Sequence, residues 1–390
     1  MGTRRTAAGL AAGAAAAAVA GLAAAELRVG RGVRPGREDW RTAPVLPRGA
    51  TLLGVSHRPL QAAEFGLDPA KSLDELLRLP FQIVRLAAYW NRVEPEPGVF
   101  RPDELDRQLD AVEAAGRRVV LCLGPVKAFG YPEFFVPGHH LGTPLPEGAL
   151  IRPSDRPDLH AAGLRHLWRL VDRYRDRDCV IAWQVEHDAV DPLGMEHSWR
   201  LSESWVRAEA AAVRAADPRG RPVLLNGFLP TSSAVAVQQY WRTRDQGDSL
   251  DVARRNADIV GIDDYPRHAV AGLGPLTAYL DGGAAPWLQR RRKAMFRWAA
   301  DGPGRGLMVV EGQAEPWETV TRPPDPARGH PASCPPERLI ANYNRCLGWA
   351  RNAPVPLRAY LFWGAEYWLL RARQGDDSYL RAARRVLEES

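Results

Sequence analysis

The 390-residue sequence has only four cysteines, and their spacing excludes the usual cysteine-based sites. No CxxC pair occurs and no histidine stands at zinc-finger spacing, which argues against a structural zinc site. If Cys334 and Cys346 share one helix, they lie about 15 Å apart, too far for a disulfide. Together with Cys122 and Cys179, they are therefore expected to be buried core residues.

Basic charge is also scarce on the body of the chain. The net charge is +6, but residues 1–50 alone carry +5, from eight arginines against three acidic residues. Nucleic-acid-binding domains concentrate Lys and Arg on their folded surface. The remaining residues are nearly neutral, so nucleic acid is excluded as the expected partner.

One candidate apolar run long enough to cross a membrane opens the chain. Arg4 and Arg5 precede the uncharged residues 6–25, which are mainly Ala, Gly, Val and Leu. We expect residues 1–25 to be a signal peptide or a membrane anchor, cleaved or retained, of an extracellular or outward-facing protein. Alanine is only weakly apolar, so a spanning helix would be marginal. Residues 26–49, rich in Gly and Pro, are predicted to be a linker.

From residue 50 onward, short runs of Val, Ile and Leu alternate with longer amphipathic segments. The candidate strands are 51–56, 82–89, 118–124, 180–186, 222–227, 258–263, 307–312 and 358–364. The clearest helical segments are 103–115, 158–175, 202–216 and 336–351. Near-continuous apolar strands predict a parallel sheet buried on both faces. Eight such units predict one α/β domain over 50–390, a (β/α)8 TIM barrel. A doubly wound sheet is the alternative, but no GxGxxG follows any strand.

Polar and aromatic residues cluster where the predicted strands end, which is where a (β/α)8 barrel places its active site. They are His57, Arg85, Trp90, Lys127, Glu186, His187, Asp188, Asn226, Tyr265, Glu311, Trp363 and Glu366. No Gly-rich phosphate-binding turn follows strand seven or eight, which argues against a phosphorylated substrate. Carboxylates that face each other across the barrel mouth are the equipment for glycosidic bond cleavage. Tryptophans near strand ends, Trp317 among them, offer apolar faces for sugars, with core packing as the alternative.

Four segments occupy the ends of strands two, four, seven and eight. They are Val84–Leu86 with Trp90–Gly98, Ile181–Asp188, Val309–Trp317 and Tyr360–Trp368. In this order they resemble the motifs of clan A glycoside hydrolases, the cellulase and β-galactosidase type barrels. The resemblance covers most of residues 50–385. It implies a glycosidase that acts on an oligo- or polysaccharide without a metal or organic cofactor.

Position by position, the resemblance implies that Glu311 is the nucleophile and Arg85 its charge partner. An arginine in contact with a carboxylate keeps it ionised, as a nucleophile requires. The resemblance also implies that Tyr265 donates a hydrogen bond near Glu311 and that Trp363 forms the floor of the sugar subsite. A structural ion pair is the alternative for Glu311.

The fourth strand departs from the family pattern, because His187-Asp188 stand where the family has Asn-Glu. The shorter aspartate withdraws the carboxyl by up to about 1.5 Å, which would widen a retaining separation toward the inverting range. Asp188 is the expected proton donor through a shifted loop. Glu186 points to the same face but lies deeper, and His187 can donate a proton near neutral pH. A fourth alternative is that acid catalysis is lost.

Further residues are predicted to contact substrate hydroxyls: His57, Lys127, His187, Asn226 and Glu366. Pairing with Asp263 or Glu366 is the alternative for His57 and Lys127. The long aromatic segment 129–140 is predicted to be a substrate-binding loop. His139-His140 do not predict a metal site, because neighbouring residues rarely ligate together and no third ligand is recognisable.

We therefore expect a retaining glycoside hydrolase that uses Glu311 as nucleophile and Asp188 as acid/base. A different class of function is a catalytically impaired carbohydrate-binding barrel. A third hypothesis is a glycosidase whose proton donor comes from another segment. The sugar, the linkage, the exo or endo mode and the oligomeric state stay open.

Overall fold

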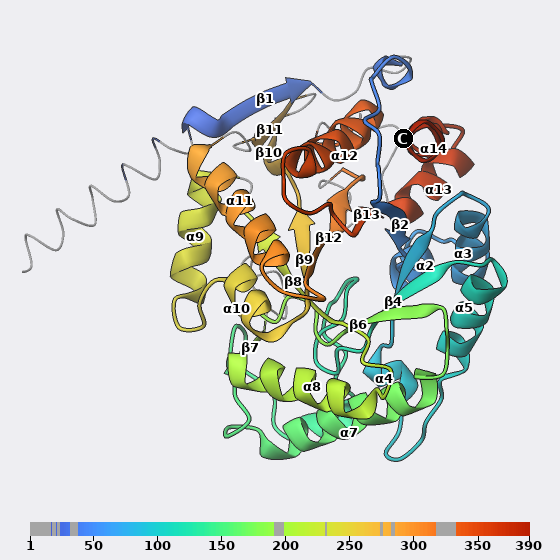
Figure 1. Ribbon diagram of the computed structural model, residues 1–390, viewed down its shortest axis with the longest axis vertical. Helices are drawn as coiled ribbons and strands as arrows, with labels where there is room; N and C mark the ends of the chain where they lie inside the picture. The colour runs from blue at the N-terminus through green and yellow to red at the C-terminus, as the bar shows by residue number, and fades with distance from the viewer. Residues whose placement is uncertain are drawn as a thin grey trace, which may run out of the picture.

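Eight parallel strands close into a barrel in the computed structural model (Figure 1). The structure describes residues 17, 21, 24–31, 38–190, 199–230, 232–273, 276–281, 285–316 and 333–390. The barrel strands are β2 (Leu52–Ser56), β3 (Ile83–Ala87), β4 (Arg118–Cys122), β6 (Val180–Gln184), β8 (Val223–Leu229), β9 (Ile259–Asp264), β12 (Gly306–Gln313) and β13 (Ala359–Trp363). Each matches a predicted strand to within two residues at either end. The (β/α)8 barrel is confirmed and the doubly wound sheet is excluded.

Helices surround the barrel (Figure 1). They are α2 (Pro59–Glu64), α3 (Pro69–Leu77), α4 (Trp90–Val93), α5 (Asp103–Ala114), α6 (Gly138–Leu141), α7 (Pro157–Tyr174), α8 (Glu203–Ala216), α9 (Ser233–Thr243), α10 (Ser249–Asn256), α11 (Pro286–Ala300), α12 (Pro336–Ala350), α13 (Ala365–Arg373) and α14 (Ser378–Glu389). Their starts follow from the sequence: Pro157 opens α7, and Ser202 caps α8 by accepting the backbone N–H of Trp205. The four predicted helical segments are therefore confirmed as α5, α7, α8 and α12.

Apolar side chains fill the barrel interior. The cluster consists of Ile83, Val120, Ala182, Leu224, Ile259, Met308, Val310, Ala359 and Leu361. They alternate with side chains that pack outward against the helices, as barrel strands require. Gly54 of β2 is needed for closure, since a Cβ there would lie 2.2 Å from the carbonyl oxygen of Ile83. The polar site residues lie above this layer, at the carboxyl ends of the strands.

The predicted domain boundary at residue 50 is corrected by the packing of the preceding segment. Strand β1 (Leu27–Arg31) pairs antiparallel with β11 (Leu276–Leu280), which pairs with β10 (His268–Leu273). Figure 1 shows β1 beside these strands at the edge of the barrel. The 3-10 helix η1 (Asp39–Arg41) buries Trp40 to 4% exposure in the main core. The described part of the predicted linker is therefore packed on the domain, while residues 32–37 lie outside the description.

The expected signal or anchor falls almost wholly outside the described residues and stays a prediction. Among the helices of the described chain, none has both the length and the apolar character needed to span a membrane. The four cysteines are all buried and free, as expected. The short strands β5 (Leu150–Ile151) and β7 (Arg200–Leu201) pair with each other beside the barrel.

Candidate active site

Glu311 of β12 is held by donors that come from different strands. Its Oε1 accepts a hydrogen bond of 3.0 Å from Nη1 of Arg85 in β3. Its Oε2 accepts one of 2.6 Å from the hydroxyl of Tyr265, which follows β9. Glu311 is only 4% exposed, so these charge-assisted hydrogen bonds lie in a largely dry environment. The structure thus brings together the predicted nucleophile, its arginine and its tyrosine.

Arg85 is itself fixed on three sides. Its Nε donates to Oε1 of Gln184 at 2.8 Å, and its Nη2 lies 3.2 Å from Nδ1 of His187. The ring of Phe129 covers the guanidinium, with 4.1 Å from Cζ to the ring centroid. Arg85 is fully buried, so its direction toward Glu311 is set by these contacts.

The contacts of His187 define its tautomer. An arginine nitrogen can only donate, so Nδ1 of His187 must accept from Arg85, and Nε2 then carries the hydrogen of the neutral ring. Burial, followed by the charges of Arg85 and Lys127, holds the pKa of His187 well below its usual value. The Nε2–H group lies 3.5 Å from Oε1 of Glu311 and 3.9 Å from Oδ2 of Asp188. His187 is therefore a neutral donor rather than a charged acid.

Asp188 reaches the site through an unusual backbone conformation. Its φ of 44° lies in the left-handed region, which aspartate tolerates better than most residues. Its backbone N–H donates to Oδ1 of Asn226, and its carbonyl accepts from Nζ of Lys127. Its Oδ1 accepts 2.7 Å from Nδ2 of Asn226. The Asp188 side chain is thus presented from a left-handed backbone position that Asn226 and Lys127 hold in place.

Asp263, at the end of β9, lies on the other side of Asn226. Its Oδ2 is 2.6 Å from Nδ2 of Asn226. Burial, followed by the charges of Glu311 and Asp188, raises the pKa of Asp263 well above its usual range. Burial and these two neighbouring charges thus disfavour the ionised form of Asp263.

Glu133 is a site residue that the sequence did not single out. Within segment 129–140, its carboxylate, a carboxylate oxygen of Asp188 and a ring nitrogen of His187 all lie within 4.8 Å of one another. The buried Nζ of Lys127 lies 4.0 Å from Oε2 of Glu133. The predicted loop thus reaches the site, but the length and aromatic content of the segment could not reveal which of its residues enters.

Glu186, two residues beyond the end of β6, is buried and bound to the loop after β4. Its two oxygens accept the backbone N–H groups of Val126 and Lys127, at 3.1 Å and 2.6 Å. It also hydrogen-bonds the buried carboxyl of Glu209, whose Oε1 accepts from Nε1 of Trp205. Burial and then the charge of Glu186 raise the pKa of Glu209 well above its usual value. The two buried carboxyls therefore favour sharing one proton, and Glu186 holds the loop after β4 through its two backbone N–H donors.

A second charge cluster lies beneath Trp363. Arg58 donates both Nη atoms to Glu315, at 2.7 and 2.9 Å, and its Nε to Glu366, at 2.9 Å. Its guanidinium stacks on the Trp363 ring, with 4.5 Å from Cζ to the centroid. Although burial acts in the opposite sense, Arg58 holds the pKa of Glu366 below its usual value. Glu366 is thus fully buried and engaged with Arg58, and Nδ1 of His57 lies 3.5 Å from it. His57 thus lies beside Glu366, one of its two predicted pairing partners, and its contact with substrate stays a prediction.

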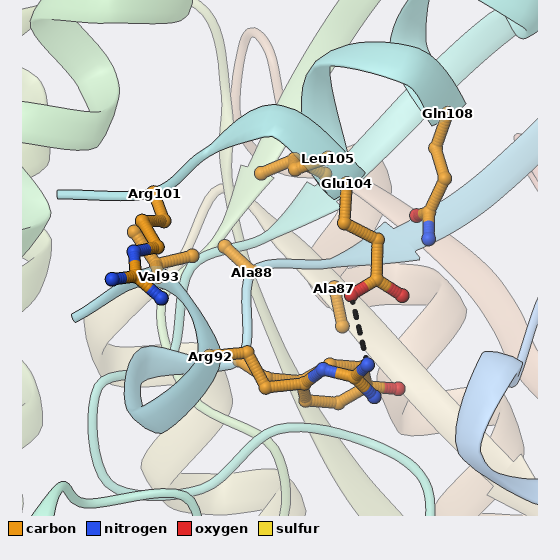
Figure 2. A pocket seen from close by; sticks show the side chains of 9 residues that line it. Ala87, Ala88, Arg92, Val93, Arg101, Glu104, Leu105 and Gln108 are labelled. Carbon is orange, nitrogen blue, oxygen red and sulfur yellow. Dashed lines mark ion pairs between the residues drawn. The ribbon is translucent and has the colours of Figure 1, made fainter. Parts of the chain in front are cut away.

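The remaining predicted tryptophans are not part of the described site. Trp90 is fully buried and stacked between His140 and His166, so its indole has no free face for a sugar. Its burial overturns the substrate-contact prediction. Trp317 lies outside the described residues. Figure 2 shows a small pocket between α4 and α5, where Arg92 pairs with Glu104; it contains no predicted site residue.

Comparison with known proteins identifies the fold. No family model and no curated protein matches the chain. Among solved structures, GH5_18 from Streptomyces cattleya in complex with GlcNAc has a TM-score of 0.54 at 15% identity, covering 87% of this chain and 81% of that one. Native xylanase 10B from Thermotoga maritima has a TM-score of 0.52 at 14% identity, covering 88% and 98%.

A β-galactosidase from Halorubrum lacusprofundi also aligns, with a TM-score of 0.52 at 17% identity, over 87% of this chain and 58% of that one. All three are similar to this chain in architecture at low sequence identity. The chain therefore shares the (β/α)8 barrel fold of these three proteins, as its strand pattern predicts.

Proposed function

We propose that this protein hydrolyses O-glycosidic bonds of a carbohydrate and that Glu311 is its nucleophile. The observation that carries the proposal is the Glu311 carboxylate between Arg85 and Tyr265 at the barrel mouth. The arginine places its positive charge against the carboxylate that must attack an anomeric carbon. A protein that only binds sugar has no need of a buried carboxylate prepared in this way.

The proposed acid is Asp188, which protonates the leaving oxygen while Glu311 forms an ester with the sugar. Water then cleaves that ester and gives a proton back to Asp188, so the configuration is retained. Since Nε2 of His187 lies 3.9 Å from Oδ2 of Asp188 and 3.5 Å from Oε1 of Glu311, those two oxygens are at most about 7.4 Å apart. This limit allows the retaining distance of about 5 to 5.5 Å.

Glu133 is the specific rival to Asp188, because both carboxylates lie near His187. We expect Asp188→Asn to slow substrates with poor leaving groups about 100-fold or more, and activated aryl glycosides much less. Glu133→Gln is the matched substitution and should change both substrates by less than about fivefold. The reverse pattern would assign the acid to Glu133. Equal losses on both kinds of substrate would remove Asp188 from the acid role.

Export is proposed together with this activity, because an extracellular carbohydrate is a natural substrate for a protein that carries an export signal. The proposal is supported by the basic start and apolar run of residues 1–25. Mass analysis of the amino terminus after expression in a bacterial host tests it. A start near residue 26 on protein outside the cytoplasm supports export with cleavage. Intact, cytoplasmic protein would contradict export.

A further inference from the structure

Two loops outside the Glu311 site bring together three side chains of the kinds that bind metal ions. Glu94 follows α4, and His139 and His140 lie in α6. Nε2 of His139 and Nε2 of His140 are 3.5 Å and 3.2 Å from the same carboxylate oxygen, Oε1 of Glu94. One ligand atom from each residue lies within 4.8 Å of the other two. Two adjacent histidines alone predict no site; the fold supplies the third ligand.

Contacts with neighbouring residues hold Glu94 and His140 in position. Nε1 of Trp90 donates to Oε2 of Glu94 at 2.8 Å, so Oε1 is the oxygen that turns toward the histidines. The ring of His140 stacks on Trp90, with centroids 4.7 Å apart. Arg92 ties α4 to α5 through Glu104 at 3.1 Å, as Figure 2 shows. A carboxylate oriented by a hydrogen bond from a second residue is typical of metal ligands.

The ligand types select the metal class. Two imidazole nitrogens and one carboxylate oxygen suit Zn²⁺ and similar divalent transition metals, whereas Mg²⁺ and Ca²⁺ prefer oxygen ligands. With metal–ligand bonds of about 2.0 to 2.1 Å, tetrahedral geometry places ligands roughly 3.3 Å apart. The two observed distances to Oε1, 3.2 and 3.5 Å, bracket that value. We propose that Glu94, His139 and His140 bind one zinc-class divalent cation, with water in the remaining position.

A cation here would act on the candidate active site through one segment of chain. The ligands join the loop after β3 to the loop after β4. Between Lys127 and His139 this second loop carries Phe129 onto Arg85 and Glu133 toward Asp188. Fixing the far end of the loop lowers the entropy of its open forms. The cation is thus a structural clip for the loop and takes no part in bond cleavage.

Zinc binding to the untagged full chain, stripped with a chelator, tests the proposal. Equilibrium dialysis against ZnCl2 with metal analysis should find one zinc per chain. His139→Ala and His140→Ala should each weaken binding at least 30-fold, and Glu94→Gln at least tenfold. Saturating zinc should also raise the wild-type midpoint of thermal unfolding by several degrees, because the ligand binds only the folded state. The three variants should lose this rise.

Two control variants keep the result specific. Glu96→Gln removes an exposed carboxylate two residues from Glu94 and should bind zinc like the wild type. Asp188→Asn disables the other ligand group, Glu133, His187 and Asp188, and should also leave the bound zinc in place. Each variant's circular dichroism without metal checks that it is folded. No zinc at 100 µM, or zinc that persists in folded His139→Ala and His140→Ala but leaves with Asp188→Asn, would overturn the proposal.

Discussion

The carboxyl groups around the barrel mouth differ in the hydrogen-bond donors and charges that surround them. This difference indicates different roles. Glu311 accepts hydrogen bonds from Arg85 and Tyr265, whereas burial and two neighbouring charges raise the pKa of Asp263. Glu186 shares a proton with Glu209 and serves the loop above it. Charge compensation therefore leaves Glu311 as the carboxylate best prepared to attack.

The hydroxyl of Tyr265 is the most direct test of how Glu311 is positioned. Tyr265→Phe removes the 2.6 Å hydrogen bond and leaves the ring against Phe228. Loss of a hydrogen bond to a charged group should lower kcat/KM for aryl glycosides about 10- to 100-fold. The exposed Tyr240→Phe is the control and should change nothing. Unchanged kinetics in Tyr265→Phe would show that this bond does not serve the reaction.

The shared proton of Glu186 and Glu209 predicts a pH dependence of stability. Burial raises the pKa of both groups above the value of 4.5 for an unfolded chain. Folding then takes up a proton, so the contribution of the pair is full at low pH and declines as pH rises past 4.5 toward the folded pKa values. In Glu209→Gln, the side-chain amide donates a hydrogen bond to Glu186 at every pH. The stability of this variant should therefore decline less as pH rises.

Thermal unfolding of the wild type and Glu209→Gln between pH 6 and pH 9 checks this sign. Across that range, the unfolding midpoint of Glu209→Gln should fall less than that of the wild type, by a difference of at least about 3 °C. Glu96→Gln, which replaces an exposed carboxylate, should follow the wild-type curve. Parallel curves for Glu209→Gln and the wild type would mean that the pair holds no proton at neutral pH.

At this scale, the sequence could locate the residues that sit on strands. Glu311, Arg85 and Asn226 lie within barrel strands, so the barrel topology brings them together. Glu133 could not be located, because its approach depends on the path of a long loop. Trp90 was misplaced because an aromatic residue after a strand can face either the site or the surrounding helices.

Elements show the same division between regular and irregular structure. The eight barrel strands could be predicted because short apolar runs alternate regularly with amphipathic segments along the chain. Strand β1 could not be predicted, since its pairing with β11 is long-range and its apolar residues Leu27 and Val29 are partly exposed. The short helix η1 was likewise hidden in a segment whose glycines and prolines indicate a linker.

The close approach of β2 and β3 predicts a large effect of one methyl group. In Gly54→Ala, the new Cβ would meet the carbonyl of Ile83 at 2.2 Å, and backbone cannot easily retreat. Unfolding in urea should show a loss of about 2 kcal/mol or more. Gly348→Ala in α12 is the control, because nothing lies within 4 Å; it should gain up to about 1 kcal/mol. Equal effects of the two substitutions would contradict this packing.

At the scale of the whole molecule, the folded body begins before residue 50. Arg385 of α14 donates to the carbonyl oxygens of Trp40 and Ala43, and Trp40 lies in the main core. A chain starting at residue 38 should therefore unfold within about 3 °C of the full chain, whereas one starting at residue 50 should unfold at least about 5 °C lower. Identical midpoints for both chains would restore the boundary at residue 50.

Glu311 is the central residue of the proposed activity, and a panel of activated aryl glycosides tests its role without requiring the acid. The full chain and its Glu311→Ala variant would be assayed side by side for aryl release. We expect the wild type to release the aryl group from at least one sugar and the variant to lose at least about 1,000-fold of that rate. Equal release by both proteins, or no release by a folded wild type that still binds glycans, would contradict it.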